Sequence, residues 1–169
     1  MEQPDPDREL DFAYAMRSIF LSRRMEHVPV ILLAEDDAND VFFVRRAFQK
    51  AGVKCQILDV PNGQEAIQYL QGTAPYENRG DFPLPQLLLL DLKMPLVNGF
   101  DLLEWLRSRA DLGDLPALVL SSSAHEEDVA RAQSLGAREY HVKPSDLARL
   151  TELARELAAK WLQPSVVAR

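Results

Sequence analysis

Four groups of polar side chains follow directly after short apolar runs. They are Glu35-Asp36-Asp37, Asp91, Ser121 and Lys143. Two carboxylates about 4 Å apart repel by about 4 kcal/mol at an effective dielectric of about 20, and a hard divalent cation relieves this repulsion. Oxygen ligands suit Mg²⁺, while a lysine ammonium and a hydroxyl can hold phosphoryl oxygens. Together these groups predict magnesium-dependent phosphoryl transfer, with Asp91 as the nucleophile that becomes an aspartyl phosphate.

This chemistry requires the four groups to meet at one edge of a sheet. Five apolar runs, which alternate with segments of helical periodicity, are residues 30–34, 55–60, 87–90, 117–120 and 140–142. Apolar rather than alternating strands indicate a parallel sheet with helices on both faces. Right-handed crossovers and five strands favour the order 2-1-3-4-5. We therefore expect an α/β fold, a flavodoxin-like (βα)5 doubly wound parallel sheet, with its crevice at the carboxyl ends of the strands.

The chain divides into three parts by composition. Residues 1–27 form an expected N-terminal extension with an amphipathic helix, residues 28–163 carry the alternating strands and helices, and residues 164–169 are a tail. The apolar side of the extension, with Phe12, Met16 and Phe20, fits an arm that binds a partner or forms a homodimer. The alternative is an upstream start, because Met25 resembles an ordinary beginning for the domain that follows.

Composition excludes several classes of protein. The 169 residues carry a net charge of −7, so direct binding to DNA is not expected. A single cysteine, Cys55, rules out an internal disulfide and a multi-cysteine zinc site. No apolar run approaches the roughly 18 residues of a membrane span. We expect a cytoplasmic protein that does not enter the membrane.

The motifs, taken in order, resemble the CheY-like receiver domain of response regulators in two-component signalling. They are Glu35-Asp36, Asp91-Leu92-Lys93-Met94-Pro95, Ser121 and Lys143-Pro144, and the resemblance runs from about Val28 to Trp161. It implies that Asp91 is the phosphoacceptor. It also implies a Mg²⁺ site in which Asp36, Asp91 and the backbone carbonyl of Lys93 are ligands and Glu35 acts mainly through water.

The same resemblance assigns a conformational switch. Ser121 corresponds to the switch hydroxyl, Tyr140 to the switch aromatic residue and Lys143 to the lysine that contacts the phosphoryl group. The end of the strand favours Ser121 over its two neighbouring serines, and Tyr140 has a second explanation as ordinary core packing. The Lys143–Pro144 bond would be cis in this family. Outside the site, Asp37 and Ser145 are expected helix caps.

The resemblance also implies partners. A receiver is phosphorylated by a sensor histidine kinase, and it is a phosphoacceptor rather than an enzyme, apart from its own phosphorylation and dephosphorylation. The loop from Tyr76 to Pro85 and the Glu-Asp-Asp-Ala-Asn-Asp opening resemble single-domain regulators paired with phytochrome kinases, so the kinase is expected to be a bacteriophytochrome. We expect no DNA-binding or enzymatic output domain, and we therefore expect the output to be a protein contact or onward phosphotransfer.

Two other classes stay open at this point. A receiver-like binding or dimerisation module would never be phosphorylated, but such modules usually lose one acid or the lysine, and all are present here. A phosphatase of the haloacid dehalogenase type would also use an aspartate nucleophile. That chemistry needs a second aspartate two positions later, where this sequence has Lys93.

Overall fold

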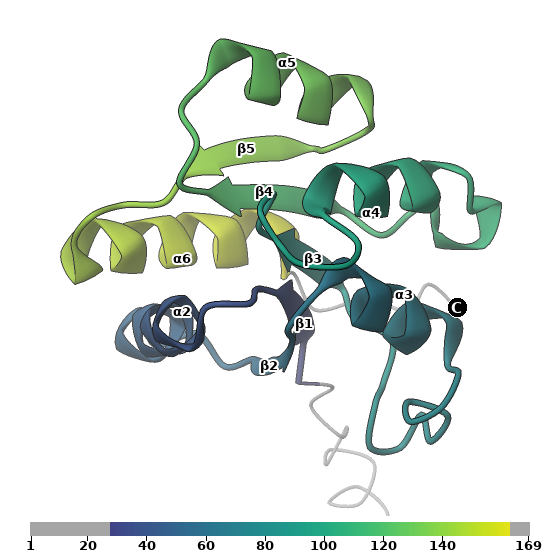
Figure 1. Cartoon of the computed structure of the whole chain (residues 1–169). Helices are drawn as coiled ribbons and strands as arrows, with labels where there is room; N and C mark the ends of the chain where they lie inside the picture. The colour runs from purple at the N-terminus through teal and green to yellow at the C-terminus, as the bar shows by residue number, and fades with distance from the viewer. Residues whose placement is uncertain (1–27, 163–169) are drawn as a thin grey trace, which may run out of the picture.

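Five parallel strands lie in the order β2-β1-β3-β4-β5 in the computed structural model, which describes residues 28–162 (Figure 1). The strands are β1 (Val30–Ala34), β2 (Gln56–Val60), β3 (Leu87–Leu90), β4 (Ala117–Ser121) and β5 (Glu139–Val142). This order confirms the predicted flavodoxin-like sheet. The expected extension, residues 1–27, and the expected tail, residues 164–169, lie outside the described residues.

Helices cover both faces of the sheet. They are α2 (Ala38–Lys50), α3 (Gly63–Gln71), α4 (Gly99–Arg107), α5 (Glu126–Ser134) and α6 (Leu147–Trp161), with a short 3₁₀ turn at Ala110–Leu112. Helices α2 and α6 lie on one face, and α3, α4 and α5 lie on the other (Figure 1). All residues of β1, β3 and β4 are buried, which explains why these strands are apolar throughout.

Side-chain caps fix where the helices begin, and therefore where the site loops end. Asp37 caps α2 as expected, because its carboxylate accepts a hydrogen bond from the backbone N–H of Asn39 at 2.7 Å. The cap of α6 is Asp146 rather than the expected Ser145, and its carboxylate accepts from the N–H of Arg149. Serine and aspartate cap helices about equally well, so the sequence alone does not separate these two adjacent residues.

The loop that follows β3 is held by close backbone contacts. The N–H of Gly63, at the start of α3, donates to the carbonyl oxygen of Val97 at 2.9 Å. A Cβ atom at position 63 would lie 2.5 Å from that oxygen, so only glycine allows this approach. The loop that carries Lys93 is therefore fixed to the start of the neighbouring helix.

A bilayer-crossing helix would need more length and more apolar character than any helix in residues 28–162 has.

Candidate functional site

The register of the sheet brings the predicted acidic residues to one level. Ala34 pairs with Leu90 across β1 and β3, so Glu35 and Asp91 follow side by side. The N–H of Asp91 donates to the carbonyl oxygen of Ala34 at 2.9 Å, and the N–H of Glu35 donates to that of Val60 at 3.0 Å. Ladder hydrogen bonds thus extend to the site residues and fix their backbones.

The predicted acidic cluster is present. Glu35, Asp36 and Asp91 each place a carboxylate oxygen within 4.8 Å of the other two, and Glu35 and Asp91 are each only 5% exposed. Oδ2 of Asp91 accepts from the N–H of Lys93 at 2.8 Å, whereas Oδ1 is buried and has no hydrogen-bond partner within the described residues. A buried carboxylate oxygen of this kind is costly unless a cation binds it. An oxygen-ligated divalent cation fits this set of donors.

Lys143 reaches the cluster from the end of β5. Its Nζ lies 2.6 Å from Oε2 of Glu35, 2.6 Å from Oδ2 of Asp40 and 3.6 Å from Oδ1 of Asp91. Burial alone would lower the pKa of Lys143, but hydrogen bonds with Asp40 and Glu35 and the charges of Glu35 and Asp91 raise it above its usual value. Lys143 is therefore a fully charged ammonium group beside the predicted phosphoacceptor.

Burial lowers the pKa of a lysine, but it raises the pKa of a carboxylic acid such as Glu35, which lies beside Lys143. Desolvation raises the pKa of Glu35, although hydrogen bonding and charge attraction from Lys143 work against this rise. The other oxygen of Glu35, Oε1, accepts from the N–H of Asp37 at 3.1 Å. Glu35 is thus fixed between the N-terminal cap of α2 and Lys143.

Sequence reasoning missed Asp40, which is one of the two carboxylates nearest to Lys143. Asp40 lies in the first turn of α2, and acids in that position are usually explained by the helix dipole. The sequence did contain a pattern that indicates this role. The helix after β1 must begin at the edge of the sheet that carries the site. An acid there lies within reach of a lysine at the end of β5.

The two predicted switch residues lie near each other at the end of β4. Ser121 is the last residue of β4 and is fully buried, whereas Ser122 is exposed. The hydroxyl of Tyr140 donates to the backbone carbonyl oxygen of Ser123 at 2.9 Å. Burial raises the pKa of Tyr140, while hydrogen bonds with Ser123 and Ser121 lower it. Tyr140 is half-buried against the core, so its position fits both a switch and a packing role.

One expectation at the site is wrong. The cis peptide bond within the described residues is Ala74–Pro75, so the Lys143–Pro144 bond is trans. The two isomers of an X-Pro bond differ by only about 0.5–1 kcal/mol, so the sequence alone does not determine which is present. The N–H of Lys143 still pairs with the carbonyl oxygen of Ser121 at 2.8 Å, which continues the ladder between β4 and β5.

Fold and site together define a receiver domain. The sequence matches the family profile of the response regulator receiver domain over residues 31–155, and the chain belongs to this family. Receiver domains bind a divalent metal at an acidic pocket and accept phosphoryl groups from histidine kinases. The acidic cluster and Lys143 occupy the corresponding edge of this sheet.

The chain is similar to several response regulators. It is 31% identical over 134 residues to the response regulator Rcp1 of Synechocystis, covering 79% of this chain and 89% of Rcp1. A response regulator in red light signalling of R. palustris, RPA3017, superposes with a TM-score of 0.77 at 30% identity, covering 84% of this chain and 99% of that one.

Two further solved structures are a phosphorylated and a metal-bound response regulator. The phosphorylated cyanobacterial phytochrome response regulator RcpA has a TM-score of 0.74 and 29% identity, covering 82% of this chain and 97% of RcpA. The Mn²⁺-bound form of Rcp1 has a TM-score of 0.70 and 28% identity, covering 83% of this chain and 97% of that structure. This chain is thus a homologue of phytochrome response regulators.

Proposed function

We propose that this protein is a single-domain response regulator that accepts a phosphoryl group from a histidine kinase onto Asp91. The observation that carries the proposal is the burial of the Asp91 carboxylate and the set of charged groups around it. Asp91 is buried and clustered with two other acids. Its Oδ1 has no hydrogen-bond partner in residues 28–162, and the Lys143 ammonium lies 3.6 Å from that oxygen. Such an arrangement suits a group that receives both a cation and a phosphoryl group.

The proposed reaction is an in-line displacement. An oxygen of Asp91 forms a bond to phosphorus, the N–P bond of the kinase phosphohistidine breaks, and its electron pair returns to the imidazole nitrogen. Glu35, Asp36, Asp91 and the backbone carbonyl of Lys93 would hold Mg²⁺, which supplies positive charge next to the transferring group. Lys143 neutralises a phosphoryl oxygen from the other side. The protein is a phosphoacceptor and not an enzyme with turnover.

Phosphorylation would be read out through Ser121 and Tyr140. The Ser121 hydroxyl turns toward a phosphoryl oxygen, and Tyr140 moves into the space that becomes available. Tyr140 is on β5, between α5 and α6, so the change reaches the surface formed by these three elements. That surface is the proposed contact for a downstream protein or a phosphotransfer partner.

The proposed kinase is a bacteriophytochrome that works in the cytoplasm. Support comes from relatives: RPA3017 is described as acting in red light signalling, and RcpA is described as a phytochrome response regulator. A chain with one cysteine, which has no partner for an internal disulfide, also suits a reducing compartment.

Phosphotransfer from purified kinases tests the proposal. Histidine kinases of the source organism, bacteriophytochromes included, are labelled with radioactive ATP and mixed with wild type and with Asp91→Asn. We expect rapid transfer to wild type from a phytochrome kinase, only in the presence of Mg²⁺, and no transfer to Asp91→Asn. Absence of transfer from every kinase and from acetyl phosphate would favour a binding module that is never phosphorylated.

A homodimer formed through residues 1–27 remains a prediction, because this segment lies outside the described residues. Deletion of residues 1–24 tests it by mass in solution. If the full chain is a dimer and the shortened chain is a monomer, the arm is supported. If both chains have the same oligomeric state, the arm is rejected.

A further inference from the structure

Lys143 forms an ion pair with the phosphoacceptor, but its hydrogen bonds go to two other acids. Its Nζ lies 2.6 Å from carboxylate oxygens of Glu35 and Asp40, but 3.6 Å from Asp91, which is beyond ordinary hydrogen-bond distance. A phosphoryl group on Asp91 requires this ammonium as a close donor. The ammonium has a third N–H to offer a phosphoryl oxygen, and movement of Nζ toward Asp91 would lengthen one of the two short contacts.

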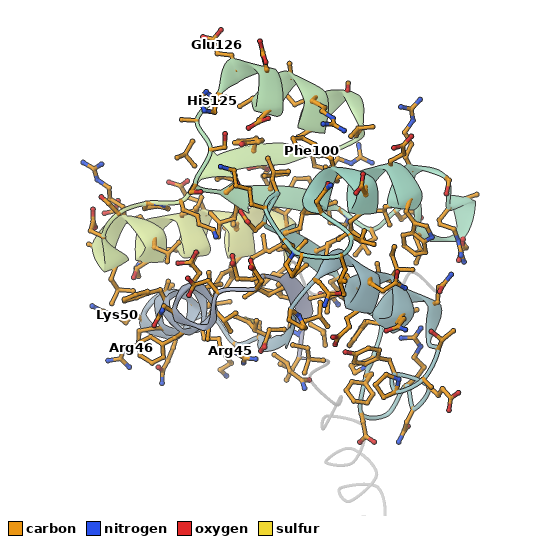
Figure 2. The ribbon with its side chains drawn as sticks, in the orientation of Figure 1. Arg45, Arg46, Lys50, Phe100, His125 and Glu126 are labelled. Atoms are coloured by element: carbon orange, nitrogen blue, oxygen red, sulfur yellow. The ribbon has the colours of Figure 1, made fainter. Side chains whose placement is uncertain are left out.

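Asp40 is free to bind Lys143 because it is not needed to cap its own helix. An acid at the third position of a helix usually reaches back to the N–H of the cap residue. Here the N–H of the cap residue, Asp37, already donates to Glu35, and the Asp37 side chain accepts from Asn39. The basic side chains of α2 that Figure 2 labels, Arg45, Arg46 and Lys50, lie on the side of the helix away from α6 and do not compete for Asp40.

The surroundings of Lys143 leave Asp40 as its anionic partner on this side. A small cleft beside Lys143 is lined by Asp40 and by apolar side chains of α2, β4, α6 and the loop between β5 and α6, namely Phe43, Val44, Leu120, Pro144 and Leu150. These apolar groups can contact the aliphatic part of the lysine but offer its ammonium no hydrogen bond. Asp40 thus supplies the contact that draws the ammonium toward α2.

The two anionic partners of Lys143 differ in how easily they can release it. The Glu35 side chain is 3% exposed, so losing its cation would leave a buried, uncompensated charge. The Asp40 side chain is 37% exposed, and water can replace the lysine there. Release from Asp40 is therefore the cheaper of the two movements.

We propose that Asp40 is a positioning residue that holds the Lys143 ammonium back from Asp91 until a phosphoryl group competes for it. The proposal rests on the proposed function, because the competing group is the phosphoryl group on Asp91. Asp40 then opposes occupation of the site, and its removal should favour the phosphoryl-bound state. This differs from a structural role, for which removal should weaken the same state.

Beryllofluoride, which mimics a phosphoryl group on an aspartate, measures the competition directly. At saturating Mg²⁺ we expect Asp40→Asn to bind beryllofluoride about three to ten times more tightly than wild type, in the range that one partly exposed ionic hydrogen bond supports. Asp40→Glu retains an anion that can reach Lys143, so it should return the affinity toward that of wild type. Equal or weaker binding by Asp40→Asn overturns the proposal.

A matched variant controls for the change in net charge. Asp37→Asn removes one negative charge from the same turn, and asparagine caps a helix as well as aspartate. Asp37 forms no hydrogen bond or ion pair with Lys143 in residues 28–162 and interacts with it only as a more distant charge. We expect this variant to bind beryllofluoride as wild type does. An increase equal to that of Asp40→Asn would show a general charge effect and would overturn the role of Asp40.

A second readout does not depend on phosphorylation. The NMR signals of the Lys143 ammonium, assigned by their loss in Lys143→Arg, should shift much more in free Asp40→Asn than in Asp37→Asn, because Asp40 is hydrogen-bonded to this ammonium and Asp37 is not. Unchanged signals in Asp40→Asn would refute the positioning role even if wild type is phosphorylated. If wild type binds no beryllofluoride and accepts no phosphoryl group, the proposed function fails, and the NMR result alone then decides whether Asp40 positions Lys143.

Discussion

The backbone carbonyl oxygen of Asp91 lies against the α-carbon of Gly99. A Cβ atom at position 99 would come within 2.3 Å of that oxygen and within 2.8 Å of the Leu92 Cα. The N–H of Gly99 also donates to the carbonyl oxygen of Leu92 at 3.0 Å. The start of α4 is therefore packed directly onto the backbone that carries the phosphoacceptor, and both obstructing atoms belong to the main chain.

Gly99→Ala should disturb both stability and the site. The added methyl group forces the backbone at Asp91 and Leu92 to move, at a cost of about 2–3 kcal/mol. We expect the urea midpoint to fall accordingly, and Mg²⁺ affinity to fall with it because Asp91 is displaced. Gly113→Ala is the control, since a Cβ there would meet its nearest atom at 3.4 Å. Equal stability of the two variants would contradict the close packing.

Ser121→Ala and Ser123→Ala should have different consequences. The hydroxyl of Ser123 donates to the Asp128 carboxylate at 2.5 Å, so its loss should lower the free energy of unfolding by about 1–2 kcal/mol. Ser121→Ala should leave labelling of Asp91 possible but prevent the beryllofluoride-induced change in the NMR signals of Tyr140. A full Tyr140 response in Ser121→Ala would assign the switch to another residue.

Glu139 should make the free energy of unfolding depend on pH in the acid range, below the usual pKa of a glutamate. Burial raises the pKa of Glu139, but hydrogen bonds from Lys160, His141 and Trp161 outweigh burial, and the net pKa is lowered. A lowered folded-state pKa contributes stability that is present above the unfolded-state pKa and is lost as pH falls through the folded-state pKa. The contribution is therefore full at neutral pH and declines in acid.

Glu139→Gln tests this relationship. We expect it to unfold about 1–2 kcal/mol more easily than wild type at pH 7, with the difference shrinking as the pH falls below about 4. Urea unfolding at several pH values measures this. Glu152→Gln, on an exposed position of α6, should track wild type at each pH. A difference between Glu139→Gln and wild type that does not change with pH would show that charge is not the cause.

Mg²⁺ should stabilise the fold through the acidic cluster. A ligand that binds only the folded state adds about 2.7 kcal/mol at a concentration of about 100 times its Kd. We expect the Tm of wild type to rise with Mg²⁺, and the rise to be largely lost in Asp36→Asn. Asp37→Asn, which keeps the helix cap, should respond as wild type does. An undiminished rise in Asp36→Asn would place the metal elsewhere.

The sheet and the site's location were predictable from the sequence for a physical reason. Strands buried on both faces must be apolar, so each polar residue that ends a run marks the carboxyl end of a strand. The rules for crossover connections then predict that Asp36 faces Asp91, and the structure has carboxylate oxygens of Glu35, Asp36 and Asp91 within 4.8 Å of one another. The same pattern puts Lys143 at the carboxyl end of β5, at the same edge of the sheet as Asp91.

What the sequence did not reveal depends on side-chain direction or on small energy differences. Asp40 belongs to the site because the first turn of α2 faces Lys143, and sequence spacing does not report that direction. The isomer of Lys143–Pro144 and the choice of Asp146 over Ser145 as a cap each depend on about 1 kcal/mol or less. Local sequence patterns do not resolve differences of that size.

The central claim is that Asp91 accepts the phosphoryl group in a Mg²⁺-dependent reaction. Intact-mass measurement after incubation with acetyl phosphate, followed by fragment mapping, tests it most directly. We predict that wild type gains one phosphoryl group, mapped to Asp91, only when Mg²⁺ is present, and that Asp91→Asn gains none. Full labelling of Asp91→Asn, or labelling of wild type at another residue, would contradict the account.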